Sequence, residues 1–164
     1  SLSNTVGGAI FHDGNLLPGD AFRCGEAGHM TLIPDGKPCY CGKTGCVDAY
    51  CSARLLSDLS GGRLEDFFLG LQQNNPDYRS VWDTYLKHLA VVINNLHMLL
   101  DYDIVLGGYV GSFLTPWLDT IRHLVAERNT FEDDGSFVKL CTYQTGAAAY
   151  GAAMDVMEEF LRTV

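Results

Sequence analysis

Three cysteines, Cys39, Cys41 and Cys46, lie close together in this chain, and His29 lies a short distance upstream. Zinc prefers a tetrahedral set of thiolate and imidazole ligands, and three sulfurs with one nitrogen complete that set. Disulfides are the alternative, but the single residue between Cys39 and Cys41 hinders disulfide geometry, and the chain is long enough to fold without such cross-links. Because four protein ligands leave no open coordination position, we expect a structural zinc ion at these residues, with buried loop thiols as the other interpretation.

A carboxylate, Glu26, lies three residues before the histidine. If His29 binds zinc through one ring nitrogen, the other nitrogen carries a proton that a ligand can use. A carboxylate beside an imidazole offers both an acceptor and a donor, which suits recognition of sugar hydroxyls. A surface carboxylate next to a metal ligand is an equally good explanation of these residue types.

Two glycine pairs, Gly7-Gly8 and Gly107-Gly108, each adjoin an expected strand. Glycines let a phosphate or nucleotide approach the backbone closely, which makes both pairs candidates for a nucleotide site. Ordinary strand-to-turn geometry is the simpler explanation. The remaining cysteines are expected to be small core residues, and four histidines receive no role: Cys24, Cys51, Cys141; His12, His88, His97, His123.

Alternating strands and helices must position these side chains. The hydrophobic pattern predicts strands at 5–11, 16–17, 104–106 and 137–143, and helices at 47–59, 64–71, 78–100, 116–128 and 146–161. Strand 104–106 is of the buried parallel type. The long irregular segment 18–45 needs something to pin it, and a metal would do so. The expected fold is therefore α/β, in one domain without repeats or linkers.

Composition narrows the function. The 164 residues are 47% hydrophobic and 19% charged, as in ordinary folded domains, and the net charge is −9. Because the basic residues are scattered and the domain is acidic, we expect no nucleic-acid binding through it. We also expect no membrane association, since the most apolar stretch is too short to span a bilayer, and a cytoplasmic location, since no secretion signal opens the chain. The start without methionine suggests a chain cut at a domain boundary.

The segment Glu26-x-Gly28-His29, followed by Cys39-x-Cys41-Gly42-x-x-Gly45-Cys46, resembles the signature of the ROK family, which groups sugar-responsive repressors, open reading frames and sugar kinases. The resemblance extends over nearly the whole chain. It implies a ribonuclease-H-like, actin-like ATPase fold, of which residues 1–164 form the C-terminal lobe, with the N-terminal lobe and any DNA-binding module absent.

The resemblance also implies roles for residues. Glu26 and His29 would bind sugar, together with the acid two places after the last zinc cysteine, here Asp48 where the family usually has Glu. Gly107-Gly108 and the last helix would border the nucleotide site of kinase members. The chain departs from the kinase pattern at Ser3-Asn4-Thr5, where kinases usually have Gly-Thr-Gly. The catalytic base belongs to the other lobe.

Three functions remain open for the parent protein, while this chain alone is expected to be catalytically inert. A sugar-responsive transcriptional regulator is favoured by the altered glycine loop. A glucokinase-like sugar kinase, using ATP and Mg²⁺, is the first alternative, and a non-catalytic oligomerisation domain is the second. The expected ligand is a sugar or sugar phosphate, and the parent is expected to form a homodimer.

Overall fold

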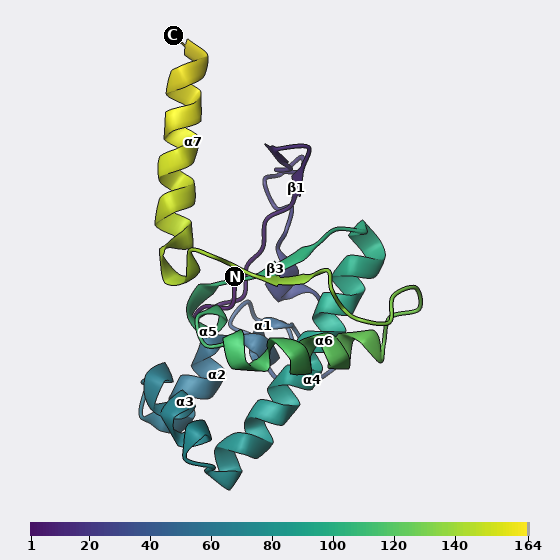
Figure 1. Cartoon of the computed structure of the whole chain (residues 1–164), viewed down its shortest axis with the longest axis vertical. Helices are drawn as coiled ribbons and strands as arrows, with labels where there is room; N and C mark the ends of the chain where they lie inside the picture. The colour runs from purple at the N-terminus through teal and green to yellow at the C-terminus, as the bar shows by residue number, and fades with distance from the viewer. Residues whose placement is uncertain (164) are drawn as a thin grey trace.

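The long helix α4 (Pro76–Leu100) organises the fold of this computed structural model, which describes residues 1–163 (Figure 1). Its first turn is capped by Asn75, whose side-chain oxygen accepts hydrogen bonds from the backbone N–H groups of Asp77 and Tyr78. Pro76 suits the first helical position, where no N–H partner is needed. One face of α4 supplies much of the core: Trp82, Tyr85, Leu86, Leu89, Ala90, Ile93.

The other helices are shorter and several pack on α4. They are α1 (Asp48–Cys51), α2 (Ala53–Ser57), α3 (Leu64–Gln72), α5 (Gly108–Gly111), α6 (Leu118–Ala126) and α7 (Ala147–Thr163), with 3₁₀ turns at Ala27–His29, Asp58–Ser60, Thr115–Trp117 and Gln144–Gly146. The prediction of one helix over 47–59 is wrong, because Ser52 is extended (φ −77°, ψ 156°). This break turns the N–H of Ala53 toward the carbonyl of Ser3, at 2.7 Å.

Two small sheets complete the α/β fold. Strands β1 (Phe11–His12) and β2 (Asn15–Leu16) form an antiparallel hairpin, while β3 (Ile104–Leu106) and β4 (Val138–Leu140) pair in parallel. The predicted parallel strand is thus confirmed, although Val105 in its middle is exposed. Strands 5–11 and 137–143 are both shorter than predicted. The first begins only at Phe11, since Gly7 and Gly8 bring no side chains to pack, and the second ends at Leu140, which pairs with the last residue of β3.

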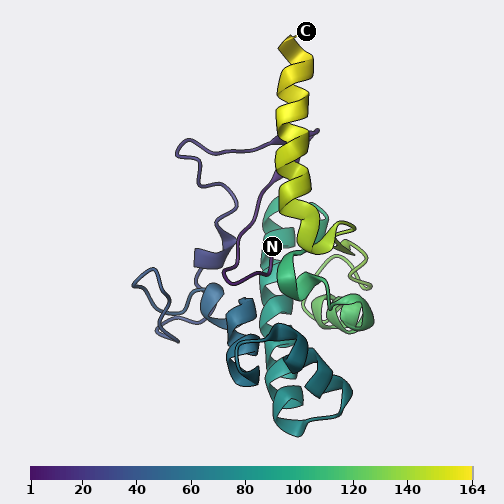
Figure 2. The same ribbon diagram turned by 90° about the vertical axis from the view of Figure 1, so that its left-hand side faces the viewer.

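The hairpin and α7 project from the helical body, as Figures 1 and 2 show from two directions. Helix α7 carries exposed apolar side chains, among them Val156, Phe160 and Leu161. Among residues 1–163, no helix is long and apolar enough to cross a membrane. Cys51 is buried as predicted, but Cys24 and Cys141 are only partly buried, which corrects the expectation that all three are core residues.

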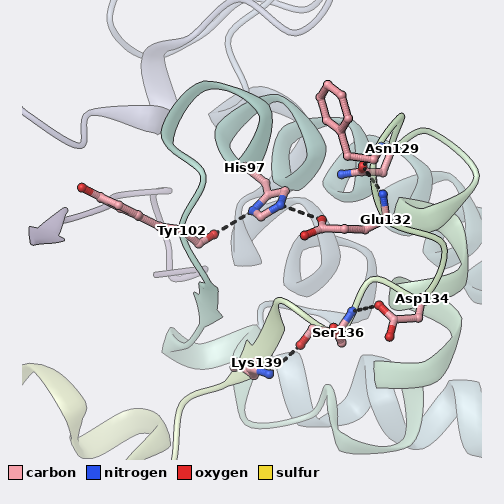
Figure 3. Close-up of polar contacts among 8 residues, drawn as sticks. His97, Tyr102, Asn129, Glu132, Asp134, Ser136 and Lys139 are labelled. Carbon is pink, nitrogen blue, oxygen red and sulfur yellow. Dashed lines mark hydrogen bonds and ion pairs between the residues drawn. The ribbon is translucent and has the colours of Figure 1, made fainter.

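His97, to which the sequence assigned no role, ties the end of α4 to the segment before β4 (Figure 3). Its Nδ1 lies 2.8 Å from the carbonyl oxygen of Tyr102, and its Nε2 lies 2.7 Å from Oε2 of Glu132. The imidazole also stacks on Phe137, with ring centroids 3.5 Å apart. Because a carbonyl can only accept, Nδ1 carries a proton.

Candidate metal centre and adjoining pockets

The four predicted metal ligands lie on a loop that is shaped by two isolated bridges. Thr31 pairs with Cys46 and Pro38 pairs with Thr44, so the chain folds back on itself around Cys39 and Cys41. The turn depends on Gly45, whose φ of +78° and close contact with the Ile33 carbonyl leave no room for a Cβ atom. The local backbone therefore brings the ligands together before any metal is considered.

The geometry of the four ligand atoms fits a metal ion. One nitrogen of His29 and the sulfurs of Cys39, Cys41 and Cys46 all lie within 4.8 Å of one another. The sulfurs of Cys41 and Cys46 are 3.8 Å apart, and Cys39 Sγ lies 4.0 Å from Nδ1 of His29. A tetrahedron with zinc–sulfur bonds of about 2.3 Å has sulfur–sulfur edges of about 3.8 Å. The residues present thus form a cluster that could hold a metal ion.

The thiols of this cluster do not ionise equally. Burial raises the pKa of Cys46 to about 11, and the neighbouring Cys41 thiol adds to the effect. The pKa of Cys41 is lowered, chiefly by a hydrogen bond from the backbone of Lys43. A divalent cation would favour the thiolate form of all three, so metal binding would release protons.

The outer side of the cluster presents Glu26 and His29. Nδ1 of His29 faces the sulfurs, which leaves Nε2 facing outward, 3.1 Å from the hydroxyl oxygen of Tyr40. Glu26 is exposed and immediately precedes the 3₁₀ turn that ends in His29. Desolvation raises the pKa of Tyr40, and the negative charges of Asp48, Cys39 and Glu26 add to the shift. The negative charges of Glu26, Cys39 and Asp48 therefore lie close enough to Tyr40 to affect its ionisation.

Asp48, the third residue implied in sugar binding, lies differently. Its side chain is buried, with the residue only 6% exposed, and Oδ1 accepts a hydrogen bond from the backbone N–H of Val6 at 2.5 Å. The carboxylate thus points into the protein, toward the loop at the start of the chain.

The two glycine pairs do not meet in one pocket. Gly107 and Gly108 line a pocket of about 380 Å³, whereas Gly7 and Gly8 line an apolar groove of about 670 Å³ between β3 and the β1–β2 hairpin. A further pocket of about 280 Å³ includes Asn4. Because serine and threonine residues line both this pocket and the one at Gly107 and Gly108, the two are here called the polar pockets. The two polar pockets share Tyr109, in α5, and Thr145, in a 3₁₀ turn, which the sequence did not single out because isolated polar residues carry no recognisable spacing.

The fold and the site together define an α/β lobe whose loop of three cysteines and one histidine could hold a metal ion. Residues 1–159 match the ROK family, and the chain belongs to that family. It is 31% identical over 168 residues to an N-acetylmannosamine kinase of Escherichia coli, covering 98% of this chain and 56% of that one. It is 29% identical over 182 residues to a glucokinase of Halalkalibacterium halodurans, covering 97% and 55%.

Solved structures share the fold. A ROK family protein from Streptococcus pneumoniae in complex with sucrose superposes with a TM-score of 0.78 at 21% identity, covering 98% of this chain and 57% of that one. A ROK family transcriptional regulator, a homologue of the E. coli MLC protein, superposes with a TM-score of 0.69 at 22% identity, covering 85% and 39%. The predicted ROK-family, actin-like fold is confirmed. The chain spans about half the length of the curated relatives that it matches.

Proposed function

We propose that this chain is the sugar-binding C-terminal lobe of a ROK-family, sugar-responsive transcriptional regulator. The single observation that carries this proposal is the loop Ser3-Asn4-Thr5, in which Ser3 and Thr5 stand where the kinases usually have glycines. Ser3 lines the pocket that contains Gly107 and Gly108, and Asn4 lines the adjoining pocket. A nucleotide phosphate needs close approach to bare backbone N–H groups, and the side chains of Ser3 and Thr5 obstruct it.

The sugar would bind on the outer side of the metal cluster. With Nδ1 of His29 facing the sulfurs, Nε2 carries the proton and donates it to a sugar hydroxyl. The exposed carboxylate of Glu26 accepts a hydrogen bond from a second hydroxyl. Zinc at His29, Cys39, Cys41 and Cys46 would hold both residues in place and take no part in chemistry, since its coordination is complete.

A sugar kinase is the second candidate, and the relatives favour it. Both sequence relatives described above are named kinases. In that case ATP with Mg²⁺ would occupy the polar pockets near Gly107 and Gly108, and the catalytic base would come from outside this chain. Either parent would be expected to act as a homodimer.

Calorimetry on the full-length protein separates the two candidates. We would titrate it with glucose, N-acetylmannosamine, their 6-phosphates and ATP, and assay sugar phosphorylation in the same samples. Sugar binding without ATP binding or product supports the regulator. Sugar-dependent ATP turnover supports the kinase and contradicts the interpretation of Ser3 and Thr5 as obstructive. Absence of binding by any sugar would contradict both.

A further inference from the structure

Asp48 joins the metal loop, residues 29–46 with the four candidate ligands, to a distant part of the chain. Its buried carboxylate accepts the N–H of Val6 across 42 positions of sequence, in a short, charge-assisted hydrogen bond of 2.5 Å. Asp48 lies two residues after Cys46, so its position follows directly from the last metal ligand. A buried carboxylate with a backbone donor is costly to disrupt, because either group would be left without its partner.

Two backbone contacts reinforce the same junction. Gly28, which immediately precedes His29, packs so closely on the carbonyl of Val6 that a Cβ atom there would overlap the oxygen. Further along the chain, at the start of α2, the N–H of Ala53 donates to the carbonyl of Ser3. The segment from Ser3 to Val6 is therefore held by Gly28, which adjoins His29, by Asp48, which follows Cys46 by two residues, and by Ala53.

The opposite side of this segment faces the polar pockets. Ser3 borders the pocket that contains Gly107 and Gly108, and Asn4 borders the neighbouring pocket. The N–H of Leu2 donates to the carbonyl of Gly107 at 2.7 Å, so the segment is also anchored there. A movement of the metal loop would therefore move the Ser3–Val6 segment, and with it the lining of both pockets.

We propose that Asp48 is a positioning residue that couples the metal loop, with its sugar-facing Glu26 and His29, to the Ser3–Val6 segment at the polar pockets. Its carboxylate holds the segment and does not contact the sugar. The short arm of aspartate suits this task, since one more methylene would move the carboxylate by about 1.5 Å, past the Val6 N–H. The coupling between Asp48 and the metal loop does not depend on the function of the protein. Only the role of that coupling in sugar sensing rests on the proposed function.

Amide hydrogen exchange of the zinc-loaded 164-residue chain tests this assignment. In Asp48→Ala we expect the Val6 amide to exchange roughly tenfold faster or more, because its acceptor is gone. Asp48→Asn keeps an oxygen acceptor of the same reach and should restore most of the protection. Asp58→Ala, which removes an exposed carboxylate at the end of α2, is the matched control and should leave Val6 unchanged.

Zinc removal by a chelator then tests the coupling itself. In the unmodified chain, loss of zinc should speed exchange at Val6, whereas in Asp48→Ala it should add little, since the link is already cut. Unchanged Val6 exchange in Asp48→Ala, or an equal zinc effect in both proteins, would overturn the assignment. Should Asp48→Ala expose every amide by unfolding, Asp48→Asn and Asp48→Glu decide: the assignment requires protection at Val6 in the first and not in the second.

Sugar titration of the full-length protein separates this inference from the proposed function. A sugar should alter exchange at Glu26–His29 and at Ser3–Val6, and Asp48→Ala should abolish only the second change. If sugars change neither segment, the proposed function fails, while the zinc-removal experiment still decides the role of Asp48. If the second change survives in Asp48→Ala, the coupling does not run through this carboxylate.

Discussion

The two ring nitrogens of His29 have separate tasks. Nδ1 faces the cysteine sulfurs and Nε2 faces outward toward Tyr40, so one side chain belongs to the metal cluster and to the candidate sugar site at once. Loss of His29 would therefore affect both. Substitutions of its neighbours separate the two tasks more cleanly, because Cys41 contributes only to the cluster and Glu26 only to the outer face.

Replacing Cys41 by Ser should release zinc and loosen the metal loop, because a neutral hydroxyl is a far poorer zinc ligand than a thiolate. We expect a loss of stability on the order of 4 kcal/mol, as for other losses of a structural metal. Metal content and thermal unfolding check this together. Cys24→Ser is the matched control, since Cys24 is outside the cluster, and it should retain zinc. An unchanged melting curve for Cys41→Ser would contradict a structural metal site.

Replacing Glu26 by Gln in the full-length protein should weaken sugar binding roughly tenfold, the typical cost of losing one charged hydrogen bond. The side chain is exposed and makes no hydrogen bond to the part of the chain that the structure describes, so the melting temperature should not change. Calorimetry and thermal unfolding measure the two effects separately. Equal affinity for the variant and the unmodified protein would remove Glu26 from the sugar site.

The metal cluster could be predicted from sequence because its ligands are close together in the chain and chemically unusual. The surroundings of Asp48 could not, because its partner is the backbone of Val6, and a main-chain donor leaves no trace in residue type. The contact of Tyr40 could not be predicted either, because its hydroxyl meets the His29 side chain only after the loop has folded back.

At the scale of elements, hydrophobic periodicity predicted the secondary structure best where a helix is long. The pattern of α4 predicts its buried face because apolar residues recur on the same side of the helix over many turns. The break at Ser52 escaped prediction, since serine fits a helix and only the contact between Ala53 and Ser3 reveals the extended residue. The length of strand 137–143 failed for a related reason: β4 ends where its partner β3 ends, and β3 is far away in sequence.

The contact of His97 with Glu132 fastens α4 to the segment that leads into β4. Replacing His97 by Ala leaves the Tyr102 carbonyl and the Glu132 carboxylate without this partner and removes the stack on Phe137. We expect a loss of roughly 1–3 kcal/mol, measured by denaturant unfolding. His123→Ala is the control, because its contact with Glu127 is exposed and should contribute little. Equal effects of both substitutions would show that burial of His97 adds nothing.

At the scale of the molecule, exposed apolar surface gathers on the projecting α7. Val156, Phe160 and Leu161 are all exposed there, and such surface favours contact with another protein surface. The chain alone should therefore self-associate as its concentration rises. Phe160→Glu should shift the association to concentrations about tenfold higher or more, since a charge opposes burial of that face. Sedimentation velocity from micromolar to millimolar concentrations measures this, with Arg54→Glu, an exposed charge change on α2, as control. A strictly monomeric chain would contradict it.

The positions of the metal ligands have a consequence for the order in which the protein is made. All four lie between positions 29 and 46, and Asp48, which anchors the loop to Val6, follows at once. A ribosome therefore releases a segment that could close around a metal ion while α4 is still being synthesised. The parallel pair β3–β4 must wait until residue 138 has emerged, because its strands are separated by α5 and α6. Short loops close fast and distant pairs close slowly, so metal loading can precede the completion of the sheet.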